Sequence, residues 1–479
     1  MKMKHRIMLI DPPGFEGVSI GRILGSFGTN KADQVWPPYD LQIMAGYCKK
    51  EGHKFKILDA NNLKMDYEDV KFEIKKYNPD WVIYITSFPT FLLDAQTAFI
   101  AKEVNKKIKT ICMTMSMLSI NNIKSHLKKI KEIDFIPWGE PEIPVMALLN
   151  DTKPKKIRGI YYHDDTGKLK FSGGIAEKAK NLDIFGIPVH SALPIRIYKC
   201  PMALKLPMTI VNCSRGCTNK CVHCQSRFQS PIRYRSVGNV IKELDEIKSL
   251  GIKEIKFYDC TLPSNRRFIE ELCKKMIEKK YNFSWNCNSR AEVLDEKLLG
   301  LMKKAGCHTI AIGCESSDRN ILNKMGKNET PEQIEHAVKL VKRAGMRVLM
   351  YLTFGLEGES EETMKKTFEF AKKLNPEFVT FGIVVPAIGT PFYESLKQKG
   401  YLINKKLENQ DPNALPSFEY PNLSSKTLHE FTRRAYKKYY FRPGYVWMRL
   451  KNLKSLTELQ MTVSSALSII KRYSIEKIR

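Results

Sequence analysis

Three cysteines, Cys217, Cys221 and Cys224, stand within eight residues near the middle of the 479-residue chain, in the spacing C-x3-C-x2-C. A closed structural zinc site takes four nitrogen or sulfur ligands, whereas a four-iron cluster held by three cysteines leaves one iron open to an outside ligand. The spacing therefore indicates an iron–sulfur cluster or a zinc site completed by Cys213 or His223. Zinc is the weaker alternative, because Cys213 belongs to the preceding strand and His223 lies between two ligands.

The elements around the cysteines predict an open, partial barrel. Over 208–400 a strand is followed by a helix six times, without the glycine fingerprint of dinucleotide-binding sheets. Chemistry in such barrels lies at the carboxyl ends of the strands, and the cysteines directly follow the first strand. The predicted strands are 208–213, 253–258, 283–288, 308–314, 347–353 and 378–385, and the predicted helices are about 236–250, 264–280, 295–305, 331–344, 361–373 and 391–399.

Residues 1–150 predict a second α/β region, a Rossmann-like, doubly wound parallel sheet. Continuously apolar strands at 6–10, 54–58, 81–86 and 110–115 are separated by helical segments at 41–51, 67–76, 94–105 and 122–130. Ligands of such sheets bind beyond the carboxyl ends of the strands. Those ends carry Asp11, Pro12, Pro13, Ser87, Phe88, Gly139 and Glu140.

Two further regions complete the expected organisation. Residues 151–207 form a connector with a hairpin over 161–170, and residues 401–479 form a helical, basic C-terminal region. From Arg433 onward that region has twelve Lys or Arg against two Glu, with aromatic residues interleaved. This pattern fits helices that cap the barrel, contact with an anionic membrane, or contact with a phosphate backbone.

The whole composition bounds the class of protein. A net charge of +28 suggests nucleic acid, an anionic membrane surface or an acidic substrate, or else lysines spread over solvated faces. The 12 cysteines, mostly isolated in apolar patterns, favour a reducing compartment. With neither a signal peptide nor an apolar run of 18 residues, we expect a cytoplasmic protein.

The cysteine triplet and its barrel resemble the radical S-adenosylmethionine (SAM) superfamily. In that family three cysteines hold a [4Fe–4S] cluster, the fourth iron binds SAM, and one electron from a flavodoxin or ferredoxin type of donor cleaves SAM to a 5′-deoxyadenosyl radical. The resemblance implies that Cys217, Cys221 and Cys224 ligate iron. It places His223 and Gly355 at the adenine, Tyr258 and Asp259 at the SAM ammonium, Arg290 at the SAM carboxylate, and Glu315 at the ribose hydroxyls or the ammonium.

Three of these residues also have structural interpretations from the sequence alone. Asp259 fits a helix N-terminal signal, Arg290 can pair with Glu292, and Glu315 can be a solvated turn residue. Their joint position at strand ends favours the site.

Both halves together, over about 1–450, resemble the cobalamin-dependent class of radical SAM enzymes. The matching stretches in the first half are 11–13, 36–41, 51–53, 59–61 and 138–142. The D-x-H-x-x-G motif is absent, as is usual in this class, so no protein His would bind cobalt. Met113–Ser116 replaces a small turn common in the class, a change that would alter the corrinoid pocket.

The resemblance implies C-methylation of a hydrophobic, small-molecule substrate. The stretch 434–466 looks most like members that act on tetrapyrroles or on isoprenoid and hopanoid lipids. The alternatives are radical ring closure or oxidation without methyl transfer, RNA methylthiolation, and a zinc-stabilised basic scaffold. Nucleic acid is not expected, because the C-terminal region is helical rather than an all-β RNA-binding module, whereas peripheral membrane contact through it stays open.

Overall fold

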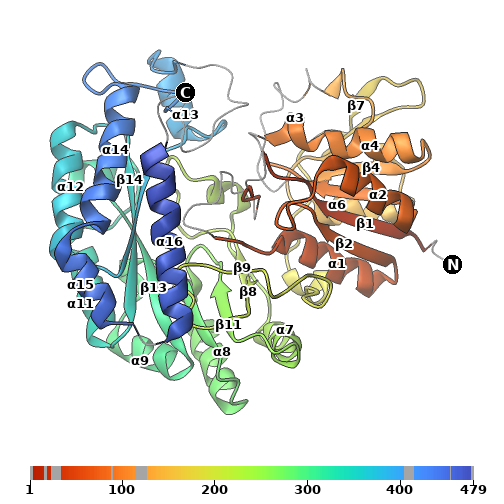
Figure 1. The fold of residues 1–479 in the computed structure, drawn as a ribbon. Helices are drawn as coiled ribbons and strands as arrows, with labels where there is room; N and C mark the ends of the chain where they lie inside the picture. The colour runs from red at the N-terminus through yellow and green to blue at the C-terminus, as the bar shows by residue number, and fades with distance from the viewer. Residues whose placement is uncertain are drawn as a thin grey trace. The chain divides into compact units, whose positions relative to one another are not determined.

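The computed structural model describes residues 4–15, 19–22, 34–87, 90–113, 124, 127–403, 415–453 and 455–475. Two compact units make up the chain, one built mainly from residues 1–197 and the other mainly from residues 198–479 (Figure 1). Both are α/β structures with parallel sheets, as predicted.

The first unit is a seven-stranded sheet in the order β2-β1-β3-β4-β5-β6-β7. The first five strands are parallel, and the predicted hairpin adds β6 and β7 antiparallel at one edge. The strands are β1 Arg6–Asp11, β2 Lys54–Asp59, β3 Trp81–Ile85, β4 Lys109–Met113, β5 Phe135–Pro137, β6 Ile160–His163 and β7 Leu169–Phe171. The helices are α1 Tyr39–Glu51, α2 Tyr67–Tyr77, α3 Phe91–Asp94, α4 Gln96–Val104 and α6 Glu142–Leu149.

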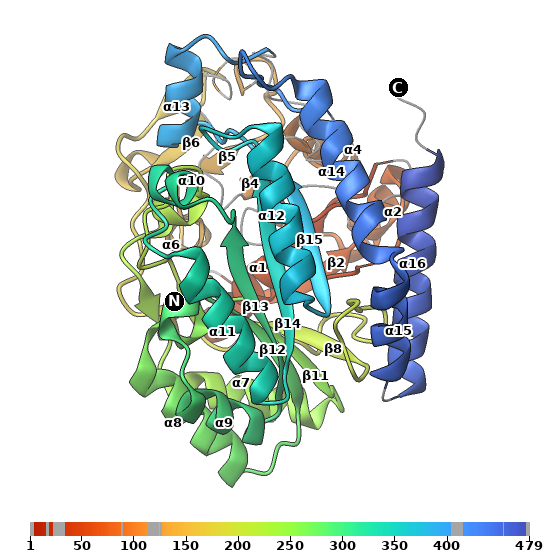
Figure 2. The ribbon, with the colours of Figure 1, turned by 90° about the vertical axis from the view of Figure 1, so that its left-hand side faces the viewer.

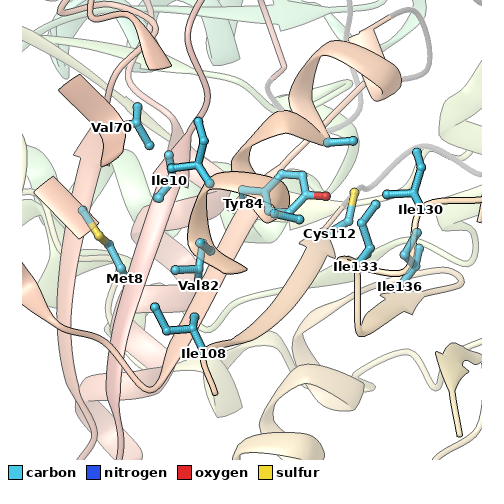
Figure 3. Close-up of a cluster of buried hydrophobic side chains, with 14 of the residues drawn as sticks. Met8, Ile10, Val70, Val82, Tyr84, Ile108, Cys112, Ile130, Ile133 and Ile136 are labelled. Carbon is cyan, nitrogen blue, oxygen red and sulfur yellow. The ribbon is translucent and has the colours of Figure 1, made fainter. Parts of the chain in front are cut away.

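The central strands of this unit are largely apolar because they are buried on both faces. Every residue of β3 is buried, because helices cover both faces of the sheet. Figure 3 shows Val82 and Tyr84 of β3 packed with Met8, Ile10 and Cys112 of the neighbouring strands. The predicted helix at 94–105 is divided into α3 and α4, and most of the helix predicted at 122–130 lies outside the described residues.

The second unit is a half-barrel of six parallel strands in the order β15-β14-β13-β12-β11-β8, which confirms the predicted partial barrel. Its strands are β8 Met208–Val211, β11 Glu254–Phe257, β12 Ser284–Ser289, β13 Cys307–Glu315, β14 Arg347–Phe354 and β15 Phe378–Ile383. The helices around it are α7 Val237–Ser249, α8 Arg266–Glu278, α9 Glu296–Lys304, α10 Arg319–Lys324, α11 Pro331–Arg343, α12 Glu361–Leu374 and α13 Pro391–Gln398.

Three C-terminal helices, α14 Ser425–Tyr440, α15 Pro443–Lys451 and α16 Leu456–Ile475, follow the barrel (Figure 2). α14 protects the edge strand β15, whose outer backbone groups have no further strand to pair with. The hydroxyl of Tyr440 accepts from Val379 N at 2.9 Å and donates to Val379 O at 2.6 Å, and the hydroxyl of Tyr436 accepts from Phe381 N at 3.1 Å. Within the described chain, no helix is both long and apolar enough to cross a membrane.

Candidate active site

The three cysteines lie on a loop that is closed at its base by a short ribbon. Two-residue strands β9, Ser214–Arg215, and β10, Arg233–Tyr234, pair antiparallel at either end of the loop. Gly216 starts the loop with φ +92°, and a Cβ there would lie 2.9 Å from the carbonyl oxygen of Gln229. Only glycine suits both this backbone conformation and this close approach, so residue 216 brings the two sides of the loop together.

The middle of the cysteine loop is held by backbone bonds to two distant segments. Val222 N donates to Met325 O at 3.0 Å, and Phe392 N, in the first turn of α13, donates to Val222 O at 3.2 Å. Val222 stands between Cys221 and Cys224, so these bonds fix the part of the loop that carries two of the three thiols.

The three thiols are half-buried, and polar groups lie beside two of them. Asn219 N donates to Cys217 Sγ at 3.4 Å. Burial raises the pKa of the Cys221 thiol to about 11, while the Lys327 ammonium and the Arg290 guanidinium act to lower it. Cations beside a cysteine stabilise the thiolate that binds metal.

The donor set fits a four-iron cluster. Among the residues that the structure describes, no three Cys, His, Asp or Glu side chains are arranged to hold one metal ion. A four-iron cluster does not require three side chains to meet at one metal ion, because each thiolate binds a different iron. His223 Nδ1 is also buried beside these thiols without a hydrogen-bond partner in the described chain. By contrast, Cys213 is fully buried, and burial raises the pKa of its thiol well above the usual value.

Asp259, just beyond β11, is buried behind the cysteine loop. Its two oxygens accept from Cys213 N at 3.1 Å each, and Ser214 Oγ donates to its Oδ1. Burial raises the pKa of this carboxyl to about 6, although these hydrogen bonds act to lower it. Asp259 therefore joins the ends of two strands at the start of the loop. Tyr258, its neighbour, is half-buried and donates its backbone N–H to Val211 O at 2.9 Å.

Arg290 lies at the end of β12 with a side chain only 7% exposed. Its Nε donates to Glu292 Oε1 at 2.8 Å, the structural pairing that the sequence allowed, and its Nη2 donates to Lys327 O. Nη2 also lies 3.6 Å from Glu329 Oε2. The guanidinium is thus already paired within the protein while lying close enough to Cys221 to affect that thiol.

Glu315 ends β13 with φ +66°, a left-handed conformation that is uncommon for a residue with a side chain. Its Oε2 accepts from Thr353 Oγ1 at 2.6 Å. A Cβ at Gly313 would lie 2.8 Å from Glu315 Oε1 and 3.5 Å from Lys327 Nζ, so both side chains lie over this glycine. The carboxylate and the ammonium therefore converge at the carboxyl end of β13.

Sequence reasoning missed Lys327 and its partner Glu329. Their side chains are 4% and 0% exposed, and Lys327 Nζ lies 2.9 Å from Glu329 Oε2. Glu329 Oε1 also accepts from the backbone N–H of Ala291. In sequence the two charges stand among Gly, Asn and Thr and read as a solvated turn, so only their burial identifies them.

Gly355 follows β14 with φ +84°. A Cβ there would lie 2.7 Å from Leu428 Cδ2 and 2.9 Å from Phe418 Cζ, and Tyr420 donates its hydroxyl to Gly355 O at 3.0 Å. The chain's own side chains therefore pack against this glycine, and its predicted approach to adenine stays a prediction.

The carboxyl edge of the first unit holds a buried ion cluster between β1 and β3, where the strand order reverses. Arg22, which the sequence did not single out, has Nη1 2.7 Å from Asp11 Oδ1 and Nη2 2.7 Å from Asp94 Oδ1. The same guanidinium donates to the carbonyl oxygens of Pro12 and Pro13. Burial raises the pKa of Asp11 to about 7 against the effect of Arg22.

The other predicted residues of this edge lie beyond the ends of β3 and β5, which are separated in the sheet by β4. Ser87 Oγ is 2.8 Å from Thr90 Oγ1, which donates to Asp94 Oδ2 at 2.6 Å, so Ser87 joins the Arg22 cluster. Gly139 has φ +118°, and Glu140 beside it is buried. Phe88 and the turn at 114–116 lie outside the described residues.

A half-barrel with a three-cysteine loop after its first strand is the architecture of enzymes that begin catalysis with an iron–sulfur cluster. The family model described as "Radical SAM superfamily" matches residues 211–371. An uncharacterized methyltransferase of Pyrococcus horikoshii is 30% identical over 448 residues, which cover 91% of this chain and 93% of that protein. The chain therefore belongs to the radical SAM superfamily, and it is an enzyme that uses a [4Fe–4S] cluster and SAM.

Two further similarities extend over much of both units. The anaerobic magnesium-protoporphyrin IX monomethyl ester cyclase of Rubrivivax gelatinosus is 27% identical and covers 76% of this chain and 67% of its own length. The structure of the cobalamin-dependent SAM radical enzyme OxsB, with aqua-cobalamin and SAM bound, aligns with a TM-score of 0.71 and 16% identity. That alignment covers 98% of this chain and 72% of the other, so the two proteins share a fold.

Proposed function

We propose that this enzyme is a cobalamin-dependent methyltransferase that methylates an unactivated carbon of a hydrophobic, lipid or tetrapyrrole-like substrate. One observation carries the proposal: the relative that matches 91% of the chain at 30% identity is a methyltransferase. The fold shared with a cobalamin-dependent enzyme, over the sheet unit as well as the barrel, supports the second cofactor.

The barrel residues would hold the reagents as follows. When bound, the [4Fe–4S] cluster and SAM supply a 5′-deoxyadenosyl radical, and cobalamin supplies the methyl group. Cys217, Cys221 and Cys224 hold the cluster, and Lys327 with Arg290 offsets the negative charge of the thiolates.

Four residues at the strand ends, with His223 of the loop, would bind SAM. We propose that His223 and Gly355 contact the adenine, Tyr258 the ammonium, Arg290 the carboxylate, and Glu315 the ribose hydroxyls or the ammonium. The Asp259 carboxylate is already hydrogen-bonded to Cys213 N and to the Ser214 hydroxyl. We therefore propose that it orients the cluster loop and acts on SAM only through that loop.

The carboxyl edge of the first unit would hold the corrinoid. Asp11, Ser87 and Glu140 are buried polar residues at this edge, the usual place for a ligand in such sheets. No His stands at the described carboxyl ends of β1 to β5, so a cobalt ion bound there would have no protein His ligand from them. Because Asp11 and Asp94 are both ion-paired with Arg22, their charges are engaged within the protein, and we propose that backbone and uncharged groups of this edge face the corrinoid.

The proposal is tested by anaerobic reconstitution followed by two assays. With SAM and a reductant, we expect 5′-deoxyadenosine from the wild type and none from Cys217→Ala, while Cys48→Ala, a buried cysteine of the first unit, keeps both cluster and activity. Protein loaded with hydroxocobalamin should retain a corrinoid absorbance after gel filtration. A wild type that never retains the corrinoid would sink the cobalamin part of the proposal.

Ring closure or oxidation without methyl transfer is the second candidate, favoured by the similarity to the cyclase over 76% of the chain. The two candidates differ in where the SAM methyl group goes. Deuterium-labelled methyl from SAM in the product selects methylation, whereas an unlabelled product that has lost hydrogen selects ring closure or oxidation.

The partners follow from the same chemistry. The methyltransferase relative is consistent with a small-molecule substrate. We propose a flavodoxin or ferredoxin type of protein as the electron donor, because each turnover begins with one electron. We also propose peripheral membrane contact through the basic C-terminal region, since a hydrophobic substrate would be met at a membrane.

A further inference from the structure

The last two helices expose a row of large apolar side chains. Within the part of α16 whose side chains are described, these residues recur every three or four positions, which is one face of a helix. The row, called the apolar face below, comprises Trp447 (68% exposed) and Leu450 (56%) of α15 and Leu456 (79%), Leu459 (39%), Val463 (49%) and Leu467 (60%) of α16. Apolar residues that gather in this way on a surface mark an interaction site.

Another side of α16 is anchored to the barrel by a buried ion cluster. Glu458, only 1% exposed, lies 2.7 Å from Arg347 Nη2 and 3.4 Å from Arg449 Nη2, and Arg449 also donates to Thr462 Oγ1 at 2.9 Å. Glu458 and Thr462 are one turn apart, so they fix which side of α16 faces the barrel. Leu459 and Val463, one position further along, lie about 100° around the helix from these anchors and are exposed.

The charge of this region is strongly positive where it is exposed. Arg434, Lys437 and Lys438 of α14 and Lys451 of α15 are exposed, whereas Glu458 is buried in the ion cluster. The tyrosines interleaved with these cations face the barrel instead. The hydroxyls of Tyr436 and Tyr440 accept hydrogen bonds from backbone N–H groups of the edge strand β15. Together the three helices therefore expose Trp, Leu, Val and these cations, against one exposed carboxylate, Glu430 of α14, among their described residues.

We propose that the apolar face lies in the interfacial region of an anionic lipid bilayer, with the lysines and arginines of α14 and α15 against the lipid headgroups. This deepens the proposed function, on which it rests for its hydrophobic substrate. A protein partner would need only a complementary apolar groove, whereas exposed cations of α14 and α15 together with exposed Trp and Leu complement anionic headgroups above an acyl region. Described α16 cannot span the membrane, so the helix would lie in the plane of the interface.

The test is flotation of the full-length protein with vesicles, with and without a reconstituted cluster. Wild type is compared with Val463→Glu/Leu467→Glu and with the control Phe72→Glu, which places a charge at an apolar residue that is 63% exposed in the first unit. On vesicles of equal phosphatidylglycerol and phosphatidylcholine we expect the wild type and the control to bind at least tenfold more strongly than the double variant. We also expect Trp447 emission to shift to the blue, and 0.5 M NaCl or pure phosphatidylcholine to weaken binding.

Three outcomes would overturn the proposal. They are equal flotation of the double variant and the wild type, equal binding to neutral and anionic vesicles, and a wild-type dimer that the double variant abolishes while neither protein floats. Because both substituted residues are exposed, the thermal midpoint of the double variant should match that of the wild type, which separates lost binding from lost folding. Flotation needs neither SAM nor corrinoid, so its failure leaves the methyl-transfer proposal untouched, and the reverse also holds.

Discussion

The carboxylate of Asp259 accepts the backbone N–H of Cys213 through both of its oxygens, at 3.1 Å each. These two residues are 46 positions apart, one at the end of β8 and the other at the end of β11, and Cys213 precedes the first cluster cysteine by four residues. A fully buried side chain thus fixes the direction in which the chain leaves the barrel to form the metal loop.

Removing that carboxylate should loosen the loop before it affects any other part of the barrel. Asp259→Ala leaves Cys213 N and the Ser214 hydroxyl buried without acceptors, which should cost about 3 kcal/mol of unfolding free energy in urea. Iron bound after reconstitution should fall severalfold, whereas Ser214→Ala, which removes a single donor, should keep it. If Asp259→Ala binds a full complement of iron with wild-type stability, the residue does not hold the loop.

Lys256 should make folding depend on pH above neutrality. Its ammonium is buried and donates to Asn288 Oδ1 at 2.8 Å, and burial lowers its pKa from the usual 10.5 to about 8. Between those values the unfolded chain binds the proton and the folded chain does not, so stability rises with pH from about 8 to about 10.5, by on the order of 3 kcal/mol. Lys256→Met should lack this slope when unfolding free energies are compared at pH 8 and pH 10. A slope equal to that of the wild type would assign it to other groups.

Arg22 should be essential to the stability of the first unit. Arg22→Met leaves the carboxylates of Asp11 and Asp94 buried together without their cation, a change that costs roughly 3–5 kcal/mol. Adding Asp94→Asn to the same chain removes one of the two uncompensated carboxylates and should recover part of that loss. Urea unfolding followed by far-ultraviolet circular dichroism measures the free energy of unfolding of the single and the double variant. Arg6→Met, at an exposed arginine, is the control.

The tyrosine hydroxyls on β15 should protect particular amides from exchange. Tyr440→Phe removes both an acceptor for Val379 N and a donor to Val379 O, and Tyr436→Phe removes the acceptor for Phe381 N. We expect the free energy of unfolding to fall by about 2 kcal/mol in Tyr440→Phe and by ~1 kcal/mol in Tyr436→Phe. Hydrogen exchange should accelerate at Val379 in one and at Phe381 in the other; acceleration spread evenly over β15 would show that the hydroxyls act only through packing.

Much of the architecture was predictable because local patterns decide it. The strand predicted at 347–353 is β14, Arg347–Phe354, since a parallel strand buried on both faces is apolar throughout. The cysteine loop was predictable because its three ligands are local in sequence.

What could not be predicted depends on partners that are distant in the chain. Asp259 was recognisable as a strand-end residue, but not its turn toward Cys213. Arg22, Lys327 and Glu329 read as ordinary surface charges until the fold buries them. The role of Tyr440 likewise depends on β15 being the edge strand, which only the strand order reveals.

The hydrogen bonds that hold the cysteine loop in place bear on how the enzyme could be repaired after it loses its cluster. Its ends are paired through β9 and β10, Val222 is bonded to Met325 and to Phe392, and Asp259 holds its approach from the barrel. None of these bonds involves a thiol, so we expect the loop to keep its shape when oxygen destroys the cluster. A damaged molecule would therefore need only fresh iron and sulfide to work again, and the cell could rescue it in place of making another.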